Sequence, residues 1–385
     1  MMKLNTAYRI LAVSTLLALA ACGDKAPEPK PEAKTAETAA AQAEQAAPSD
    51  ANVSEEDKAL LKQAQGFFQP LPERAEIDPA KPITDAQIKL GHQLWYEPRL
   101  SRGNTVSCNT CHNLATGGVD NLPTSQGHKG SFGARNSPTA LNAALLGSQF
   151  WDGRAKDVEE QAGGPLLNPV EMAHTDQAAV EKKIAHIPEY QAMFKEAFAE
   201  NGGAVSFDNI TKAIGAFERT LLTPSRWDDY LKGDVNALTE KERKGVRAFI
   251  NNGCIACHKG VNLGGDSFQK FGLVKGPYWN YIDSTKHDEG LFEVTKNEAD
   301  KYFFRVPGLR NVAKTFPYFH NGSVWELDKA ISIMGETQLG KTIPQEEVDD
   351  MVAFMNALTG TVPEAARTVP ELPLSPAAET HPENN

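Results

Sequence analysis

Two short stretches of the chain place cysteine and histidine at a spacing that suits covalent haem attachment. They are SCNTCH, with Cys108, Cys111 and His112, and GCIACH, with Cys254, Cys257 and His258. In each C-x-x-C-H, two thiols three positions apart can reach the two vinyl groups of one porphyrin edge, and the next residue can ligate iron. A zinc site would need further ligands at short spacing, and a redox dithiol needs no histidine directly after it. The two motifs therefore predict two c-type haems.

Composition and charge limit the classes of protein to which the chain can belong. It has 385 residues, 41% of them hydrophobic, which is long enough for two domains of ordinary size. The formal net charge of −11 does not suggest a nucleic-acid binder, which usually carries a basic face. Four of the five cysteines lie in the two motifs and the fifth is Cys22, so no pair is left for a disulfide.

The N-terminus has the features of an export signal. Lys3 and Arg9 precede a short apolar run that ends in LAAC at Cys22. This ending resembles a bacterial lipobox, which predicts a signal peptide over residues 1–21, lipidation of Cys22 and an Ala/Pro/Glu-rich tether over residues 22–54. An ordinary secretory signal with an incidental cysteine is the alternative. We expect the protein at the periplasmic face of a bacterial membrane, and the residues after Cys22 favour the outer membrane over the inner one.

The folded part of the chain repeats one plan. A helical pattern leads into each motif, a long Gly-rich stretch follows, and an amphipathic helix closes each half. The first half is expected to close with helices over residues 180–198 and 210–221. We therefore predict an all-α fold of two tandem cytochrome c-like domains, over residues 55–223 and 224–361, with a tail over residues 362–385.

The residue on the other side of each iron decides its chemistry, because an iron closed by methionine or histidine passes electrons and an open iron can bind peroxide. Met334 is a suitable second ligand for the His258 haem, whereas the helical spacing of Met351 and Met355 is typical of core residues. His128, on a Gly-rich loop, is a possible ligand in the first half or merely a solvated side chain. Glu171, in the sequence NPVEM, is either a catalytic acid/base or a helix N-terminal charge.

At this point the chain resembles the bacterial di-haem cytochrome c peroxidases, over residues 55 to about 360. The resemblance depends on both haem motifs and on the stretches GHKGSFGARNSPT, FWDGRA with Gln161 after it, NPVEM, and RVPGLRNVAKTFPYFHNG with Met334 beyond it.

The resemblance implies a role for each matching residue. His112 would be the proximal ligand of the peroxidatic haem, and His128 would cap that iron until reduction of the other haem releases it. Gln161 and Glu171 match the pair in the peroxide pocket, and Trp151 matches the tryptophan between the haems. The remaining roles fall to His258 and Met334 as ligands of the electron-transfer haem, and to Asn136, Thr315 and Pro317 as ligands of a calcium ion.

The implied reaction is the reduction of hydrogen peroxide to water with electrons from a small c-type cytochrome or copper protein, in a homodimer. A non-catalytic di-haem electron carrier is the alternative, although a carrier has no need of Gln161 and Glu171. A relative that oxidises a protein or an organic substrate has tyrosine at the position of Met334, which argues against that activity here.

Overall fold

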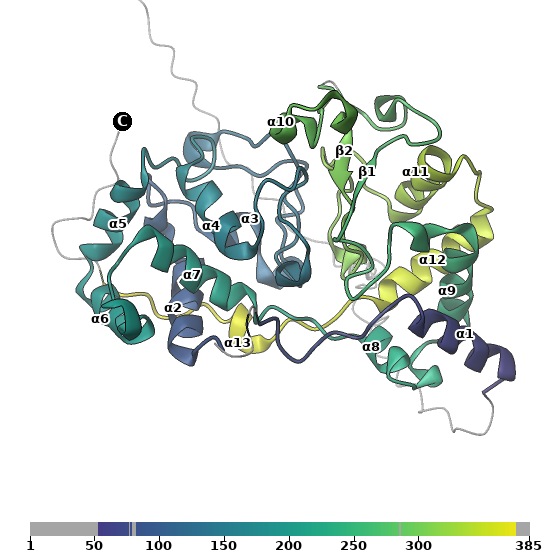
Figure 1. Cartoon of the computed structure of the whole chain (residues 1–385), viewed down its shortest axis with the longest axis horizontal. Coiled ribbons are helices and arrows are strands. Elements are labelled where there is room, and N and C mark those ends of the chain that lie inside the picture. Colours follow the sequence, from purple (N-terminus) through teal and green to yellow (C-terminus); the bar gives the residue numbers. More distant parts are fainter. Residues whose placement is uncertain (1–52, 77, 79–81, 285, 375–385) are drawn as a thin grey trace, which may run out of the picture. The chain divides into compact units, whose positions relative to one another are not determined.

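The computed structural model describes residues 53–374 except 77, 79–81 and 285 (Figure 1). The predicted signal peptide, Cys22 and residues 22–52 of the tether lie outside the described residues. The helices are α1 (Glu55–Gln65), α2 (Asp85–Tyr96), α3 (Cys108–Cys111), α4 (Val158–Leu167), α5 (Gln177–Ala185), α6 (Pro188–Ala197), α7 (Phe207–Glu218), α8 (Arg226–Leu231), α9 (Glu240–Asn252), α10 (Phe292–Thr295), α11 (Leu327–Leu339), α12 (Gln345–Ala357) and α13 (Glu364–Arg367). Two antiparallel strands, β1 (Phe268–Lys270) and β2 (Phe303–Arg305), form the sheet of the described residues. The prediction of an all-α fold is confirmed.

The helix that leads into the first haem motif packs across the helix that closes the first half. A capping box between Thr84 and Gln87 begins α2, and α2 packs against α7. The two backbones approach so closely at Gly91 that a Cβ there would overlap the carbonyl oxygen of Ala213. Glycine at this position therefore allows α2 and α7 to approach this closely in the first core.

The second half uses the same arrangement. The capping box of Thr239 and Glu242 begins α9, and α9 packs against α12. A Cβ at Gly245 would overlap the carbonyl oxygen of Asp350, as at the crossing in the first half. The repeat expected from the two motifs thus extends to the helix pair that supports each of them.

The two ends of the described chain are exchanged between the halves. In α1, Leu60 and Ala64 are buried in the second core, and Phe68 packs edge-on against Trp227. Near the other end, the Tyr96 hydroxyl donates to the carbonyl of Ala366 in α13, which is part of the first core. Figure 1 shows both: α1 lies beside α9, and the yellow C-terminal segment runs back to α2.

This exchange corrects two of the sequence-based expectations. Residues 55–68 do not pack with the first domain, to which the predicted range 55–223 assigned them, because their apolar side chains fill the second core. Residues 362–374 are more than a tail, since Arg99 donates to the carbonyl of Pro373 and Gln93 to that of Glu371. The helix expected over residues 180–198 is also divided, into α5 and α6, because Pro188 begins a new helix.

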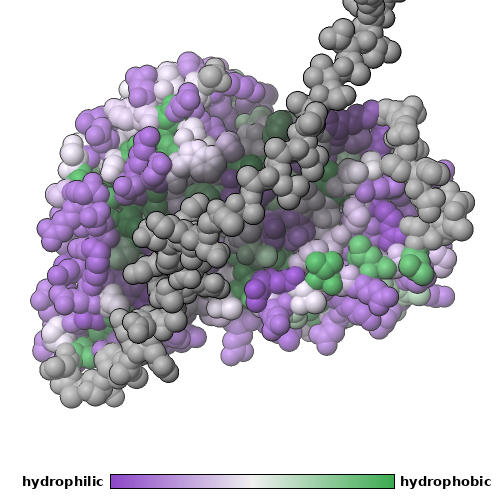
Figure 2. Space-filling view, turned by 180° about the vertical axis from the view of Figure 1, so that it is seen from behind, coloured by the Kyte–Doolittle hydropathy of each residue, from purple (hydrophilic) through white to green (hydrophobic). Residues whose placement is uncertain are grey.

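The surface is largely polar. Figure 2 shows hydrophilic residues over most of the face opposite to that of Figure 1, with hydrophobic residues between them. The described residues with large exposed hydrophobic side chains are Leu122, Phe132, Leu273, Val274, Val294, Phe316, Trp325, Val369 and Leu374. Within residues 53–374, as far as they are described, no helix has the length and hydropathy needed to cross a membrane.

Candidate functional site: two cavities on the haem motifs

The first cavity opens on the first haem motif and has a volume of about 650 Å³. Its wall includes the side chains of Cys108, Cys111 and His112, brought there by the single turn of α3. Desolvation raises the pKa of Cys111 to about 11 and also raises that of Cys108, so both thiols stay protonated until they react. Two free thiols and an imidazole at the edge of one large cavity fit covalent haem attachment.

The imidazole of His112 is neutral at ordinary pH, because desolvation lowers its pKa. The charge of Asp120 and the carbonyl groups of Pro138 and Gly118 partly offset this lowering. The buried Nδ1 has no hydrogen-bond partner among the described residues. A neutral imidazole is the form that ligates iron. His112 can therefore serve as an iron ligand without a hydrogen bond that fixes its tautomer.

Gln161 and Glu171 line the same cavity as His112. Gln161 comes from α4, and Glu171 from the turn that follows it. Desolvation raises the pKa of Glu171, and the charge of Arg154 and a 2.7 Å hydrogen bond from Asn168 Nδ2 partly oppose the shift. The carboxyl group is thus held at a pKa closer to neutrality than usual, which suits a group that accepts and returns a proton.

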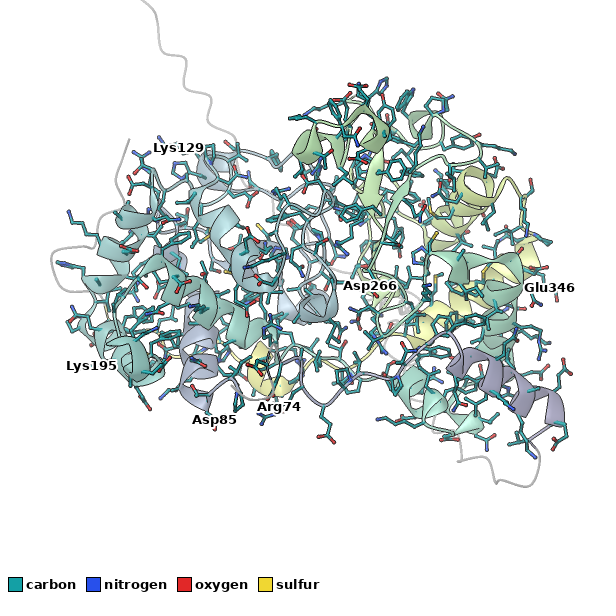
Figure 3. The ribbon with its side chains drawn as sticks, viewed as in Figure 1. Arg74, Asp85, Lys129, Lys195, Asp266 and Glu346 are labelled. Carbon is teal, nitrogen blue, oxygen red and sulfur yellow. The ribbon has the colours of Figure 1, made fainter. Side chains whose placement is uncertain are left out.

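His128 is brought next to this site but is not among the residues that line the cavity. Its backbone N–H donates to the carbonyl oxygen of Glu171 at 2.9 Å. Its ring lies beside Gly103, where a Cβ would be 3.4 Å from Nδ1. The next two residues, Lys129 and Gly130, have φ of 54° and 77°, and Figure 3 shows Lys129 at the outer edge of the first half. The loop therefore ties His128 to Glu171 through the backbone and turns back sharply after it.

The second cavity, of about 340 Å³, lies on the second motif. Its wall brings together Cys254, Cys257, His258 and Met334. Desolvation lowers the pKa of His258, and its Nδ1 lies 3.0 Å from the carbonyl oxygen of Leu263. Such a bond, with Nδ1 as donor, leaves the other ring nitrogen free to ligate a metal.

The three methionines of the second cavity differ in burial. Met351 and Met355 are 0% and 5% exposed and belong to the second hydrophobic core. Met334, on α11, lines the cavity and is only partly buried. The packing thus supports the interpretation of the first two as core residues, and Met334 is left with a side chain that faces the space a haem would fill.

Trp151 lines both cavities and is held by its neighbours on two sides. Its indole Nε1 donates to the carbonyl of Asn136 at 2.9 Å, and its own carbonyl accepts from the backbone of Arg305 at 2.9 Å. The side chain is therefore fixed in the wall that separates the two haem positions.

Sequence reasoning gave no role to Arg305, although it is the first residue of RVPGLRNVAKTFPYFHNG, one of the stretches that carry the resemblance. Arg305 lines both cavities, is 3% exposed, and has a buried Nη1 without a hydrogen-bond partner. Desolvation lowers its pKa to about 10, partly offset by Asp266, which Figure 3 labels near the foot of the two strands. The Nε of Arg305 donates to the carbonyl of Phe150 at 3.1 Å, but the described residues supply no acceptor for Nη1. A buried guanidinium with an unsatisfied N–H is costly, and the carboxylates of a haem would supply the missing acceptor. No short motif marks such a residue.

The three residues expected to hold calcium share one cavity. Asn136, Thr315 and Pro317 all line the second cavity. The amide nitrogen of Asn136 donates to the carbonyls of Leu122 and Pro123, so its oxygen is the atom left to act as a ligand. Oxygen donors of this kind suit calcium.

The comparisons with known families agree with this geometry. A family model described as di-haem cytochrome c peroxidase matches residues 85–236, and one described as cytochrome c matches residues 242–359. The cytochrome c551 peroxidase of Pseudomonas aeruginosa is 51% identical over 326 residues, which cover 84% of this chain and 92% of that protein. The cytochrome c551 peroxidase of Nitrosomonas europaea is 46% identical over 292 residues, covering 75% and 85%.

Solved structures show the same fold. A MauG-like protein associated with microbial copper homeostasis matches with a TM-score of 0.69 and 27% identity, covering 78% of this chain and 97% of that one. The di-haem peroxidase BthA of Burkholderia thailandensis matches with a TM-score of 0.62 and 21% identity, covering 80% and 94%, a likeness of fold alone.

Proposed function

Because the chain belongs to the di-haem cytochrome c peroxidase family, we propose that it divides the reduction of hydrogen peroxide between its two cavities. The chain is a cytochrome-c peroxidase, as its 46–51% identity to two enzymes of that name shows. The observation that carries the division of work is the position of the carboxylates. Glu171 lines the first cavity, whereas the described residues that line the second include no carboxylate.

In the first cavity, a haem attached to Cys108 and Cys111 and ligated by His112 would supply the iron at which peroxide binds. The protein's own part is to move a proton. Glu171 accepts the proton of one peroxide oxygen and delivers it to the other oxygen, which leaves as water, while the Gln161 amide orients the substrate. Two electrons and two further protons complete the balance, H₂O₂ + 2e⁻ + 2H⁺ giving two waters.

The second cavity receives those electrons. His258 and Met334 would hold a haem that passes electrons, and a Met/His pair favours the reduced state of the iron. The donor is a small periplasmic c-type cytochrome or copper protein. Trp151 lies in the wall between the two cavities and is a suitable route between them.

His128 controls access to the first iron. In this proposal its ring would ligate that iron in the oxidised protein and would leave it when the other haem is reduced. Support comes from the 2.9 Å backbone bond between His128 and Glu171, because a movement of the loop would shift the acid/base as well. Replacement of His128 by glycine should give an enzyme that needs no prior reduction.

Three further features belong to the same proposal. Calcium would be bound by Asn136, Thr315 and Pro317, which line the second cavity. The protein would be anchored through a lipid on Cys22 at the periplasmic face of the membrane, with the outer membrane favoured, and would act as a homodimer. These features follow from the family resemblance and the N-terminal sequence.

The proposal is tested by Glu171→Gln, with Glu196→Gln on the exposed face of α6 as the matched control. A positioned acid/base contributes on the order of 10²–10⁴-fold, so we expect kcat to fall by that factor while both haems remain bound. In the wild type, kcat should also decline as the pH falls through the raised pKa of Glu171, because only the carboxylate accepts a proton. Wild-type turnover in Glu171→Gln, measured with reduced donor and peroxide, would refute the assigned role.

A further inference from the structure

A series of aromatic rings leads from Trp151 to the surface of the second half. The ring centroid of Trp151 lies 6.3 Å from that of His320, and His320 lies 5.1 Å from Tyr278. Tyr278 lies 5.1 Å from Trp279, and the Trp279 ring stacks on His287 at 4.0 Å with an interplanar angle of 13°. The series therefore joins five rings by direct contacts.

The burial of these rings changes in one direction. Trp151 and His320 line both haem cavities, and Tyr278 is 0% exposed. Trp279 is partly buried, and His287 is exposed. The series begins in the wall between the two haem positions and ends in solvent.

Two of the inner rings have the chemistry needed to pass an electron. Tryptophan and tyrosine are the side chains that lose one electron most readily, and rings in edge contact exchange electrons quickly. The Tyr278 hydroxyl donates to the carbonyl of Asp288 at 3.1 Å, which holds the phenol in place.

A second aromatic cluster in the same half differs from this series in its burial. Trp227 stacks on Tyr230, and both rings are 0% exposed. Their ring neighbours Phe68 and Phe354 are buried too. The partly buried ring next to that cluster is Phe67, which contacts Phe68, and phenylalanine does not readily lose an electron. The series from Trp151 instead reaches the surface through a tryptophan.

We propose that Trp151, His320, Tyr278 and Trp279 form a relay that carries oxidising equivalents to the surface, where Trp279 oxidises small phenolic reductants. Hydrogen peroxide is the oxidant, and each phenol loses one electron and one proton, so H₂O₂ and two phenols give two waters and two phenoxyl radicals. Electrons travel from Trp279 through Tyr278 to Trp151. When no reductant is present, the Trp279 indole itself gives up two electrons and takes an oxygen atom from water, so that H₂O₂ and the indole give the oxygenated indole and one water. The inference depends on the peroxidase function proposed above.

The first test maps oxidised residues in the holoenzyme after peroxide is added without any donor. Peptide mass spectrometry should find oxygen added to Trp279. In Tyr278→Phe, which keeps the ring but removes the phenol, this oxidation should fall by about tenfold, equivalent to ~1.4 kcal/mol in the barrier. Tyr230→Phe, the same change in the buried cluster, should leave it unaltered.

Trp325 serves as an internal control for damage by free peroxide. It is 48% exposed, and its ring neighbour among the described residues is Phe316, outside the relay. Oxidation of Trp325 to the same extent as Trp279, or equal oxidation of Trp279 in wild type and Tyr278→Phe, would overturn the relay.

The second test separates the relay from the main reaction. Guaiacol oxidation by the holoenzyme should be largely lost in Trp279→Phe, while peroxide turnover with reduced cytochrome or copper-protein donor should be unchanged. Equal guaiacol oxidation by the variant would refute the relay and leave the proposed function intact. Failure of the wild type to turn over peroxide with any donor would instead refute the proposed function.

Discussion

The two cavities hold a C-x-x-C-H histidine in similar ways but differ in what surrounds it. The first includes Glu171 and Gln161, and its His112 has a buried Nδ1 without a partner. The described residues that line the second include Met334 but no carboxylate, and Nδ1 of its His258 lies 3.0 Å from a carbonyl oxygen. The second histidine is therefore the better oriented and the more basic of the two.

This contrast shows whether the proximal histidines or the groups that would face the substrate make the two haem sites different. A more basic iron ligand pushes electron density toward the iron and helps O–O cleavage, so the histidines alone would favour peroxide chemistry at the second site. The acid/base and the amide lie in the first cavity instead. The two haem sites therefore differ in function because of the groups that act on the substrate, and not because of the proximal histidines.

The largest effect expected at the second site comes from Met334→Ala, which removes the feature that makes this site an electron carrier. Without the thioether, the second iron should become high-spin in the absorption spectrum. Turnover with reduced donor should fall by about tenfold or more, equivalent to at least ~1.4 kcal/mol in the barrier.

Met351→Leu is the matched control for this variant, because Met351 lines the same cavity but belongs to the core. Such a volume-conserving change should leave the spectrum as it is and cost less than about 1.5 kcal/mol of stability. If Met351→Leu, and not Met334→Ala, changed the spectrum, the ligand assignment would be wrong.

A smaller effect concerns the exchanged ends of the chain. Tyr96→Phe removes the hydrogen bond to Ala366, and Gln65→Ala removes one of similar length, 2.9 Å, from α1 to the carbonyl of Leu231. Each loss should lower the free energy of unfolding by about 1 kcal/mol, the first in the first half and the second in the second half. Urea unfolding followed through each haem's absorption band measures this. Equal shifts of both halves in both variants would show that the two cores do not unfold separately.

The sequence predicted the parts of the molecule that depend on local pattern. The haem motifs, the helices before them and the closing helices have periodicity or fixed spacing, so α2, α7, α9 and α12 could be predicted. The exchange of α1 and α13 between the halves could not, because an amphipathic helix shows which face is buried but not which core buries it. Pro188 was a visible signal for the break between α5 and α6, and the expected single helix overlooked it.

The site was predictable to a different degree. Residues with a motif of their own, such as His112 and His258, followed from spacing. Met334 and Glu171 were candidates from their places in the sequence, while Gln161 was named only through the family resemblance. Arg305 and His320 were given no role from the sequence, although both line the two cavities. What distinguishes them is a buried side-chain nitrogen without a partner among the described residues, and this is a property of the folded chain.

The division of work is tested most directly by mixing the half-reduced holoenzyme with one equivalent of hydrogen peroxide in a stopped-flow spectrometer. The account predicts that the absorption bands of the first haem change at once and those of the second follow as it gives up its electron, with the fast first phase lost in Glu171→Gln. A fast first phase at the second haem, or one that is unaltered by Glu171→Gln, would contradict the assignment of peroxide chemistry to the first cavity.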